Sequence, residues 1–482
     1  MTASVLGELN GSVLDATAIA KAVRAGSLAA VDVLAAARTL AQSPAGRAMN
    51  AFITEDWDRA ARAAAAVDRR RQAGEDLGPL AGVPFSVKDV IAVAGLRITG
   101  ASKAFADTVA TTTAPAVQRL LDADAVLIGK TNCPEFAFGV TCDSPLLGRT
   151  GNPRFPANTP GGSSGGEAAS LAAGISALGV GTDFGGSVRW PAQCVGIAAL
   201  RPGIGSVPGD GQVPGVGGSF GASGTVPAAS PGMQGSFQTI GPLARSVRDL
   251  RTAFLIMSGA DPRVVAERQE SSERPEPSEG SGRAFRIAWS DGAALGPVRA
   301  EVTALMERLA AALAAEGHTV RHQPDLFADC LAPYNRLRAV DPMTDHAAAV
   351  RGREDGVTAA NLQTIQSSFA ATAADVEIAW QAANAARSAA LTQITAVDIA
   401  LLPVAGGPAG DADGRLNIDG QSAEGWEIMG HCRAVTLTGC PAVSLPVGLS
   451  AEGLPLSVQI VAGPGAELTA LDFAAMLEKL DI

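Results

Sequence analysis

Two short loops rich in glycine and serine constrain the fold of this chain, because only a glycine-rich backbone turns tightly enough to bring several N–H groups together. The first loop covers residues 161–166 and the second covers residues 181–187. Their serines Ser163 and Ser187 are 24 residues apart. Residues 167–177 are predicted to form a helix. The first loop is therefore expected to lie at the N-terminus of a helix.

Strand-like apolar runs alternate with helical patterns along the rest of the chain. A short strand is expected to end at Lys88, and a helix over about 114–122 precedes a strand over 125–129. This alternation predicts an α/β sheet. The remaining predicted elements are strands at 285–289, 399–403, 442–447 and 456–461, and helices at about 298–316 and 359–393.

The domain organisation follows from the length of 482 residues, over which the composition shows no sustained change. We expect a helical segment at residues 1–70 that packs on the core, and one large domain at residues 71–482 whose central part is about 79–250. Residues 203–236 are rich in Gly, Ser and Pro, which predicts an ordered loop. Residues about 261–282 are dominated by Glu, Ser, Arg and Pro, which predicts an exposed connector.

The composition argues against several classes of protein. The net charge is −11 and basic residues form no cluster, which argues against nucleic acid as a ligand. No apolar stretch is long enough to cross a bilayer, and the first ten residues lack the pattern of a secretory signal. The six cysteines are scattered without a CxxC spacing, so we expect free thiols and no zinc site. These features predict a cytoplasmic protein without membrane contact.

The second loop has two interpretations. It can be an ordinary glycine turn, or it can hold a nucleophilic serine, Ser187. In the second case an oxyanion hole would form from the N–H groups of four consecutive residues: Phe184, Gly185, Gly186 and Ser187. A serine hydroxyl is a poor nucleophile until a neighbouring base takes its proton, so this interpretation depends on the other segments.

The first loop allows further alternatives. It matches the G-x-S-x-G pattern of a nucleophile elbow with Ser163 at its centre, but the chain has only four histidines to complete a triad. It can also be taken for a phosphate-binding loop, since Gly129, Lys130 and Thr131 resemble the end of a P-loop. A Walker A motif needs a glycine five residues before the Gly-Lys pair, and that position is Asp124. Lys130 is therefore predicted to end a strand.

Lys88 is one of only five lysines. A lysine after a strand usually reaches solvent, which is the plainer interpretation. Here Lys88 follows the apolar residues 83–87 and precedes Asp89, and such surroundings favour partial burial. Burial lowers the pKa of a lysine, as a lysine that acts as a base requires.

In this order and at this spacing, the three segments resemble the amidase signature family of Ser–Ser–Lys hydrolases. The likeness covers most of the chain, from residues 79–89 through 194–202 and 238–245 to 438–446. The resemblance implies an α/β fold with a mixed β-sheet of about a dozen strands sandwiched between α-helices. It also implies an enzyme that needs no metal and no cofactor.

The resemblance assigns roles to the motif residues. Ser187 would be the nucleophile. Ser163, which follows a cis peptide bond in this family, would bridge Ser187 to a neutral Lys88 that accepts the proton. The N–H groups of residues 184–187 would hold the oxyanion. Supporting roles are implied for Ser164, Asp183 and Arg189.

The implied activity is hydrolysis of a carboxylic amide to an acid and ammonia or an amine, through an acyl-enzyme on Ser187. The alternative within the family is the glutaminase subunit of a tRNA-dependent amidotransferase, which works with protein partners. That branch reads the charged groups of glutamine with an acidic residue and an arginine, and the corresponding positions here hold Met429 and approximately Gln363. We therefore expect a small-molecule amide as the partner, and the family is also compatible with a homodimer.

Candidate pocket walls are aromatic and polar residues near these segments. Trp190 is preferred because it follows Arg189 directly, although core packing is the default for any Phe or Trp. The principal candidates are Phe136, Phe138, Trp190 and His431, followed by Cys142, Asp143, Tyr334 and Trp426. Their mixture predicts a small or medium, partly apolar amide.

Overall fold

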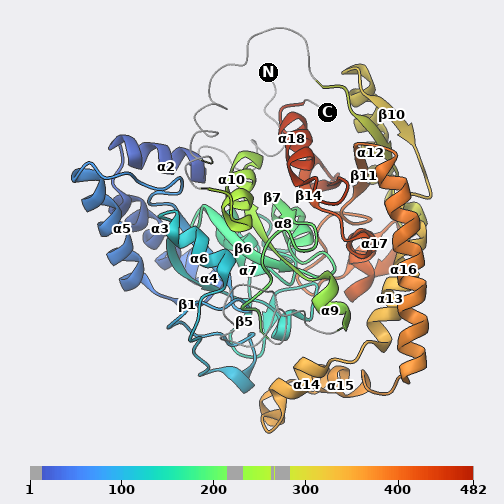
Figure 1. The fold of residues 1–482 in the computed structure, drawn as a ribbon, viewed down its shortest axis with the longest axis horizontal. Helices are drawn as coiled ribbons and strands as arrows, with labels where there is room; N and C mark the ends of the chain where they lie inside the picture. Colours follow the sequence, from blue (N-terminus) through green and yellow to red (C-terminus); the bar gives the residue numbers. More distant parts are fainter. Residues whose placement is uncertain (1–12, 214–231, 262–264, 266–282, 481–482) are drawn as a thin grey trace.

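An eleven-stranded sheet runs through the molecule (Figure 1). The computed structural model describes residues 13–213, 232–261, 265 and 283–480. In spatial order the strands are β1 (Phe52–Glu55), β3 (Val126–Thr131), β2 (Pro84–Lys88), β6 (Leu178–Asp183), β8 (Thr239–Ala244), β7 (Ala198–Arg201), β14 (Ala442–Leu449), β15 (Pro455–Val461), β11 (Ile399–Pro403), β9 (Arg286–Trp289) and β10 (Thr319–His322).

The sheet is mixed. β2 is parallel to both β3 and β6, and β9 is parallel to both β10 and β11. The pairs from β6 across to β11 are antiparallel, as is the pair of β1 with β3. Two small ribbons lie outside the sheet: β4 (Asp143–Ser144) with β5 (Gly148–Arg149), and β12 (Leu416–Ile418) with β13 (Gln421–Ala423).

Helices account for much of the rest of the described chain. The α-helices are α2 (Ala16–Ala25), α3 (Ala30–Gln42), α4 (Pro44–Met49), α5 (Trp57–Gln72), α6 (Pro115–Asp122), α7 (Gly165–Ala172), α8 (Arg189–Val195), α9 (Gly232–Phe237), α10 (Val247–Ser258), α12 (Ala300–Ala315), α13 (Leu331–Val340), α14 (Thr344–Val350), α15 (Ala359–Ser367), α16 (Ala373–Thr395), α17 (Gly430–Thr438) and α18 (Glu467–Leu477). Short 3₁₀ helices are η1 (Lys103–Phe105), η2 (Glu135–Ala137), η3 (Ala293–Leu295), η4 (Ala328–Cys330), η5 (Glu354–Gly356) and η6 (Gly425–Met429).

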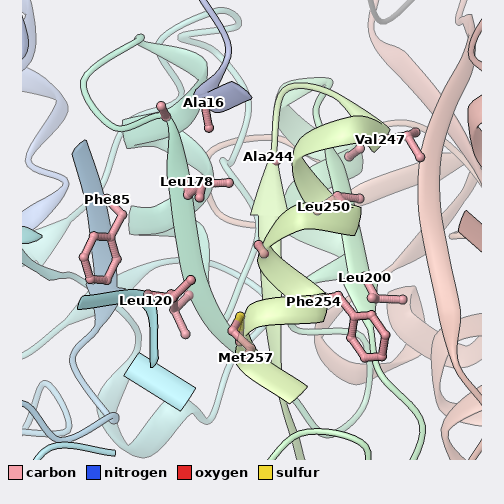
Figure 2. Packing of buried hydrophobic residues seen from close by; sticks show 14 of the residues in the cluster. Ala16, Phe85, Leu120, Leu178, Leu200, Ala244, Val247, Leu250, Phe254 and Met257 are labelled. Atoms are coloured by element: carbon pink, nitrogen blue, oxygen red, sulfur yellow. The ribbon is translucent and has the colours of Figure 1, made fainter. Parts of the chain in front are cut away.

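Both faces of the sheet are covered, as the alternation along β11 shows. Ile399 and Leu401 pack in the apolar cluster that includes residues of α10, α12 and α18. Ala400 and Leu402, which point to the opposite face because side chains alternate along a strand, pack with residues of α13, α16 and α17. Figure 2 shows α10 lying on the first face, with Phe254 among the packed side chains. The prediction of a mixed sheet between helices is confirmed.

Buried carboxylates fasten the N-terminal helices to this body and to one another. Asp249, on α10, accepts the N–H groups of Ala16 and Thr17 at 2.7 and 2.9 Å and so caps α2. Asp68, on α5, accepts the N–H of Ala30 at 2.9 Å and caps α3 in the same way. A carboxylate at a helix N-terminus meets free N–H groups and the positive end of the helix dipole, so these contacts favour docking of the helices.

Some elements differ from the sequence-based prediction. The helix after the first loop ends at Ala172, earlier than expected, because Gly174 takes a left-handed backbone conformation with φ of 74°. The long helical stretch is divided into α15 and α16. Within the predicted loop 203–236, α9 forms a short helix, and residues 214–231 lie outside the described residues. The connector predicted at 261–282 also lies almost entirely outside them.

In the described ranges, no helix is both long enough and apolar enough to cross a membrane.

Candidate active site

Lys88 is the last residue of β2 and is completely buried. Its Nζ donates hydrogen bonds to Ser163 Oγ at 2.6 Å and to Thr182 Oγ1 at 2.9 Å. The amine is held where the ends of the parallel strands β2 and β6 meet, because Thr182 lies in β6. The buried amine is therefore held by two hydroxyl groups.

Burial lowers the pKa of Lys88 to about 8. The acidic groups around it supply little negative charge at neutral pH. Burial raises the pKa of Glu167 to about 8 and that of the Cys142 thiol to about 11. Asp183 is ionised at neutral pH, but its negative charge is balanced by the ion pair with Arg189. A substantial fraction of Lys88 is consequently uncharged at mildly alkaline pH.

Ser163 lies two residues before the first residue of α7, Gly165. The Gly162–Ser163 peptide bond is cis, as the family resemblance implied. The N–H of Ser164 donates to the carbonyl of Ser187 at 3.1 Å, which fastens the first loop to the second. The two loops, separate in the sequence, are thus in direct contact.

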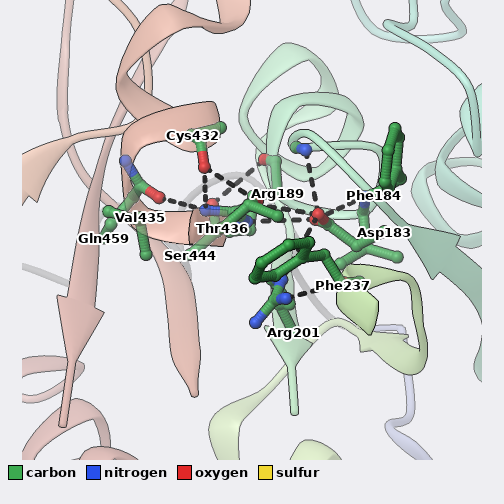
Figure 3. A network of polar contacts seen from close by, with 12 residues as sticks. Asp183, Phe184, Arg189, Arg201, Phe237, Cys432, Val435, Thr436, Ser444 and Gln459 are labelled. Carbon is green, nitrogen blue, oxygen red and sulfur yellow. Dashed lines mark hydrogen bonds and ion pairs between the residues drawn. The ribbon is translucent and has the colours of Figure 1, made fainter. Parts of the chain in front are cut away.

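The loop that carries Ser187 is held by a buried ion pair between Asp183 and Arg189 (Figure 3). Arg189 Nη2 and Nε donate to the two carboxylate oxygens of Asp183 at 2.8 and 3.0 Å. Burial alone would raise the pKa of Asp183, but Arg189 and Arg201 lower it to about 2. Arg189 also donates to Gln459 Oε1 at 2.5 Å, so the loop is tied to β15.

The backbone N–H groups of this loop are not equivalent. The N–H of Gly186 donates to Asp183 at 2.9 Å, so it is already used. Within the described residues, the N–H groups of Phe184, Gly185 and Ser187 have no acceptor. Gly186 has a φ of 125°, and a Cβ there would lie 2.7 Å from Cβ of Cys432, so only glycine fits.

A cavity of about 330 Å³ lies beside the two loops. One side is formed by Ser163, Ser187 and the backbone of Gly185. Phe136 and Phe138, in and directly after η2, contribute apolar rings to the wall. Other residues on the wall include Thr182, Phe184, Met233, Tyr334, Asn335, Arg338, Asp341, Met343, Asp345, His346, Trp426 and Arg433.

The structure places two of the predicted wall residues elsewhere. Trp190 is completely buried in the core, where its Nε1 donates to the carbonyl of Val140 at 3.0 Å. His431 lines a neighbouring cavity, and its Nε2 lies 3.1 Å from the carbonyl oxygen of Gly292. The sequence-based preference for Trp190 as a wall of the pocket is therefore corrected: all seven residues of α8 are buried, and its tryptophan faces the core.

Several cavity residues were not found from the sequence. Thr182, the second acceptor of the Lys88 amine, could have been found because it lies within the second loop. Arg338, His346 and Arg433 had no local signal, since α13, α14 and α17 bring them to the loops from far along the chain. Burial, with Arg338 nearby, lowers the pKa of His346 to about 3, so its imidazole is neutral at pH 7.

In the parts of the chain that the structure describes, no group of three or more His, Cys, Asp or Glu side chains is placed to hold a metal ion.

The comparisons with a family model, with related proteins and with a solved structure agree with one another. The Amidase family model matches residues 38–471. The chain is 32% identical over 470 residues to the indoleacetamide hydrolase of Bradyrhizobium diazoefficiens, which covers 95% of this chain and 85% of that protein. It is 30% identical over 463 residues to one subunit of the glutamyl-tRNA(Gln) amidotransferase from Synechococcus, with 89% of each chain covered. The solved structure of 6-aminohexanoate cyclic dimer hydrolase with its substrate superposes with a TM-score of 0.79 at 27% identity and covers 96% of each chain.

The mixed sheet, the loops beside the cavity and these similarities define a hydrolase that acts on amide C–N bonds. The match to the family model extends over nearly the whole chain. The chain belongs to the amidase family, as its three sequence segments predicted.

Proposed function

We propose that this protein hydrolyses a small or medium carboxylic amide to the acid and ammonia or an amine, through an acyl-enzyme on Ser187. The observation that carries the proposal is the buried amine of Lys88, which donates to Ser163 Oγ at 2.6 Å on the wall of the cavity that Ser187 also lines. A base with a pKa of about 8, hydrogen-bonded to a serine hydroxyl that lines the same cavity as Ser187, could supply the proton acceptor that a serine nucleophile needs.

Acylation begins when Ser187 Oγ attacks the amide carbon. The proton of Ser187 passes to Ser163 Oγ while the proton of Ser163 passes to Nζ of the neutral Lys88. The carbonyl oxygen becomes an oxyanion, which accepts hydrogen bonds from the free N–H groups of the second loop. Of the four expected donors, Gly186 is committed to Asp183, so the proposed donors are Phe184, Gly185 and Ser187.

The intermediate collapses when its C–N bond breaks. The ammonium of Lys88 returns its proton through Ser163 to the departing nitrogen, which leaves as ammonia or an amine. Water then attacks the ester on Ser187 and gives up a proton along the same path. The acid is released, and Ser187 and Lys88 return to their starting forms, so protons balance over the cycle.

Three supporting residues keep the two loops in position. The Asp183 carboxylate accepts N–H groups of Gly186 and Val188 and is neutralised by Arg189. This arrangement fixes the backbone before substrate binds, and preorganised donors are the more effective stabilisers of an oxyanion. Ser164 supports the first loop through its bond to the Ser187 carbonyl.

A second candidate is the glutaminase subunit of an amidotransferase, which the 30% identity to the Synechococcus protein over most of both chains favours. The charged residues that the family resemblance implies for glutamine are missing. Met429 is buried, with Sδ 3.1 Å from the Cβ position of Gly186, and Gln363 is exposed. We therefore prefer an amidase that acts without a protein partner.

The test is release of ammonia or amine by the wild type and Ser187→Ala from glutamine, short aliphatic amides, aryl amides, indoleacetamide and carbamoyl compounds. We expect release from a simple amide by the wild type and none by Ser187→Ala. A serine-reactive phosphonate should label the wild type only. Equal release by the two proteins would refute the acyl-enzyme on Ser187. Release from glutamine alone, dependent on added partner proteins, would favour the amidotransferase.

A further inference from the structure

Two arginines on the wall of the Ser187 cavity, one buried and one partly buried, lack the carboxylate that a guanidinium removed from water ordinarily has. They are Arg338 on α13 and Arg433 on α17. Among the described residues, no carboxylate lies within ion-pair distance of either. Charged groups removed from water are costly unless they are paired, so two such groups in one cavity require an explanation.

Arg338 faces the cavity from the same side of α13 as Tyr334, four residues earlier, because residues four apart share one face of a helix. Its guanidinium lies over the ring of Phe138, 5.5 Å from the centroid. Its Nη1 donates a hydrogen bond to Met343 Sδ at 3.7 Å, and a thioether is a weak acceptor. Burial lowers the pKa of Arg338, and the nearby Tyr334 and Asp341 offset this only in part.

Arg433 lies next to the catalytic loop. A Cβ atom at Gly185 would lie 3.3 Å from Arg433 Cγ, so the aliphatic part of the arginine packs against this residue of the second loop. Arg433 Nη1 donates to Asn335 Oδ1 at 2.6 Å, while its buried Nε and Nη2 have no hydrogen-bond partner among the described residues. Only 8% of the residue is exposed. Its positive charge is therefore available to whatever occupies the cavity.

Among the described residues, the acidic residues of the cavity form no close ion pair with these arginines, although Asp341 is near enough to Arg338 to stabilise its charge in part. Asp341 accepts the N–H of Met233 at 2.8 Å, which holds the start of α9. Asp345 has a partner of its own. By contrast, Arg189, which is completely buried, is paired with Asp183 at 2.8 Å. Among these three arginines, the two that lack an ion pair are therefore the two that line the cavity.

We propose that the cavity selects amides that carry a carboxylate at the end remote from the C–N bond to be broken, with Arg338 as the specificity residue and Arg433 as a second cation. This inference rests on the proposed function of Ser187. A planar guanidinium binds a carboxylate through two parallel hydrogen bonds, and the apolar rings around Arg338 strengthen them by excluding water. An α-ammonium group on the substrate, as in glutamine, would face uncompensated positive charge and bind less well.

The test compares 4-carbamoylbutanoate with pentanamide, which have the same amide and chain and differ only in a carboxylate in place of a methyl group. Binding to Ser187→Ala is measured by calorimetry, and hydrolysis by the wild type is measured as ammonia release. We expect 4-carbamoylbutanoate to bind about 10- to 100-fold more tightly than pentanamide, the effect of a charge-assisted hydrogen bond. Glutamine is expected to bind more weakly than 4-carbamoylbutanoate.

Arginine variants in the Ser187→Ala background show whether Arg338 is responsible for the tighter binding of 4-carbamoylbutanoate. Arg338→Gln should bring the affinity ratio of the two ligands close to one, and Arg338→Lys should restore part of it. Arg336→Gln is the matched control, since Arg336 lies on the same helix, is exposed and pairs with Asp375 at 3.4 Å. The control should keep the ratio of the parent. Thermal unfolding of each variant shows whether it is folded.

Equal binding of the two ligands, binding of neither, or a ratio unchanged by Arg338→Gln would overturn the inference. The outcomes separate the two proposals. If the wild type hydrolyses pentanamide and 4-carbamoylbutanoate with equal efficiency, the amidase proposal stands and the carboxylate preference is wrong. If 4-carbamoylbutanoate binds through Arg338 but the wild type releases no ammonia from any amide, the preference stands and the proposed function is wrong.

Discussion

The amine of Lys88 is enclosed by protein and meets two hydroxyl groups, so its pKa decides when it can act as a base. Burial lowers that pKa to about 8. Below this pH the ammonium form dominates, and an ammonium cannot accept the proton of Ser163. We expect kcat/KM to rise with an apparent pKa near 8 and to fall by about tenfold per pH unit on the acid side. A profile measured between pH 6 and 10 that stays flat would contradict this role.

Removal of the amine provides a direct test of the same residue. Lys88→Ala should lose about 10²- to 10⁴-fold in kcat/KM at pH 7, the contribution of a general base. Partial recovery is expected at high pH, where hydroxide can replace the base. Lys103→Ala, at an exposed lysine, is the control and should behave as the wild type. Unchanged activity in Lys88→Ala would refute the proton relay.

Ser163 is the proposed bridge between the base and the nucleophile. Ser163→Ala should slow turnover strongly and still allow slow labelling of Ser187 by a phosphonate, because the nucleophile itself remains. Lys88 keeps its second acceptor, Thr182, in this variant. Steady-state rates and labelling rates measured side by side distinguish the two effects. If both match the wild type, Ser163 is not part of the relay.

At the scale of elements, the turn from β6 to α8 depends on a single carboxylate. Asp183 binds two backbone N–H groups and is paired with Arg189, and both side chains are fully buried. Asp183→Asn leaves the guanidinium without its counter-charge, and loss of one partner of a buried pair costs about 3–5 kcal/mol.

Urea unfolding of Asp183→Asn checks this value. The matched control is Asp413→Asn, because Asp413 is 53% exposed where it pairs with Arg149 at 2.9 Å. An exposed pair contributes about 1 kcal/mol or less, so the control should be nearly neutral. Equal losses in the two variants would show that burial of the Asp183 pair is not what matters.

At the scale of the whole molecule, α18 near one end of the chain meets α10 and, through it, α2 near the other end. Glu478 accepts the N–H of Val247 at 3.1 Å, close to Asp249 and Asp15. Burial and these acids raise the pKa of Glu478 to about 7. The folded protein therefore binds more protons than the unfolded chain between about pH 4.5 and 7, and its stability falls as the pH rises through this window.

Glu478→Gln should abolish this loss of stability at higher pH, because glutamine does not ionise, while its side-chain oxygen still accepts the N–H of Val247. We expect the variant to be more stable than the wild type by about 1–3 kcal/mol at pH 8 and nearly equal to it near pH 4.5. Urea unfolding at the two pH values measures the difference. Glu316→Gln, at an exposed position, is the control. A gain that is the same at both pH values would contradict the assigned cause.

The sequence by itself determined the elements that depend on neighbours along the chain. The strand that ends at Lys88, the helix after Ser163 and the turn around Ser187 each follow from a few adjacent residues. Their local signals are strong because glycine alone permits the tight turns, and an apolar run before a lysine predicts its burial. The α/β class followed from the same patterns, and the mixed sheet between helices followed from the family resemblance.

Only the tertiary structure decided which side chains face the cavity. Trp190 is close to the end of the second loop and faces the core, whereas Arg338 and Arg433 come from helices much further along the chain and line the cavity. Local pattern predicts that a residue is buried but not on which side of its element it packs, since that depends on the docking of α13 and α17. The two loops could therefore be predicted from residues that are adjacent in the sequence. The positive charge of the cavity depends on the packing of helices that are distant from those loops in the sequence.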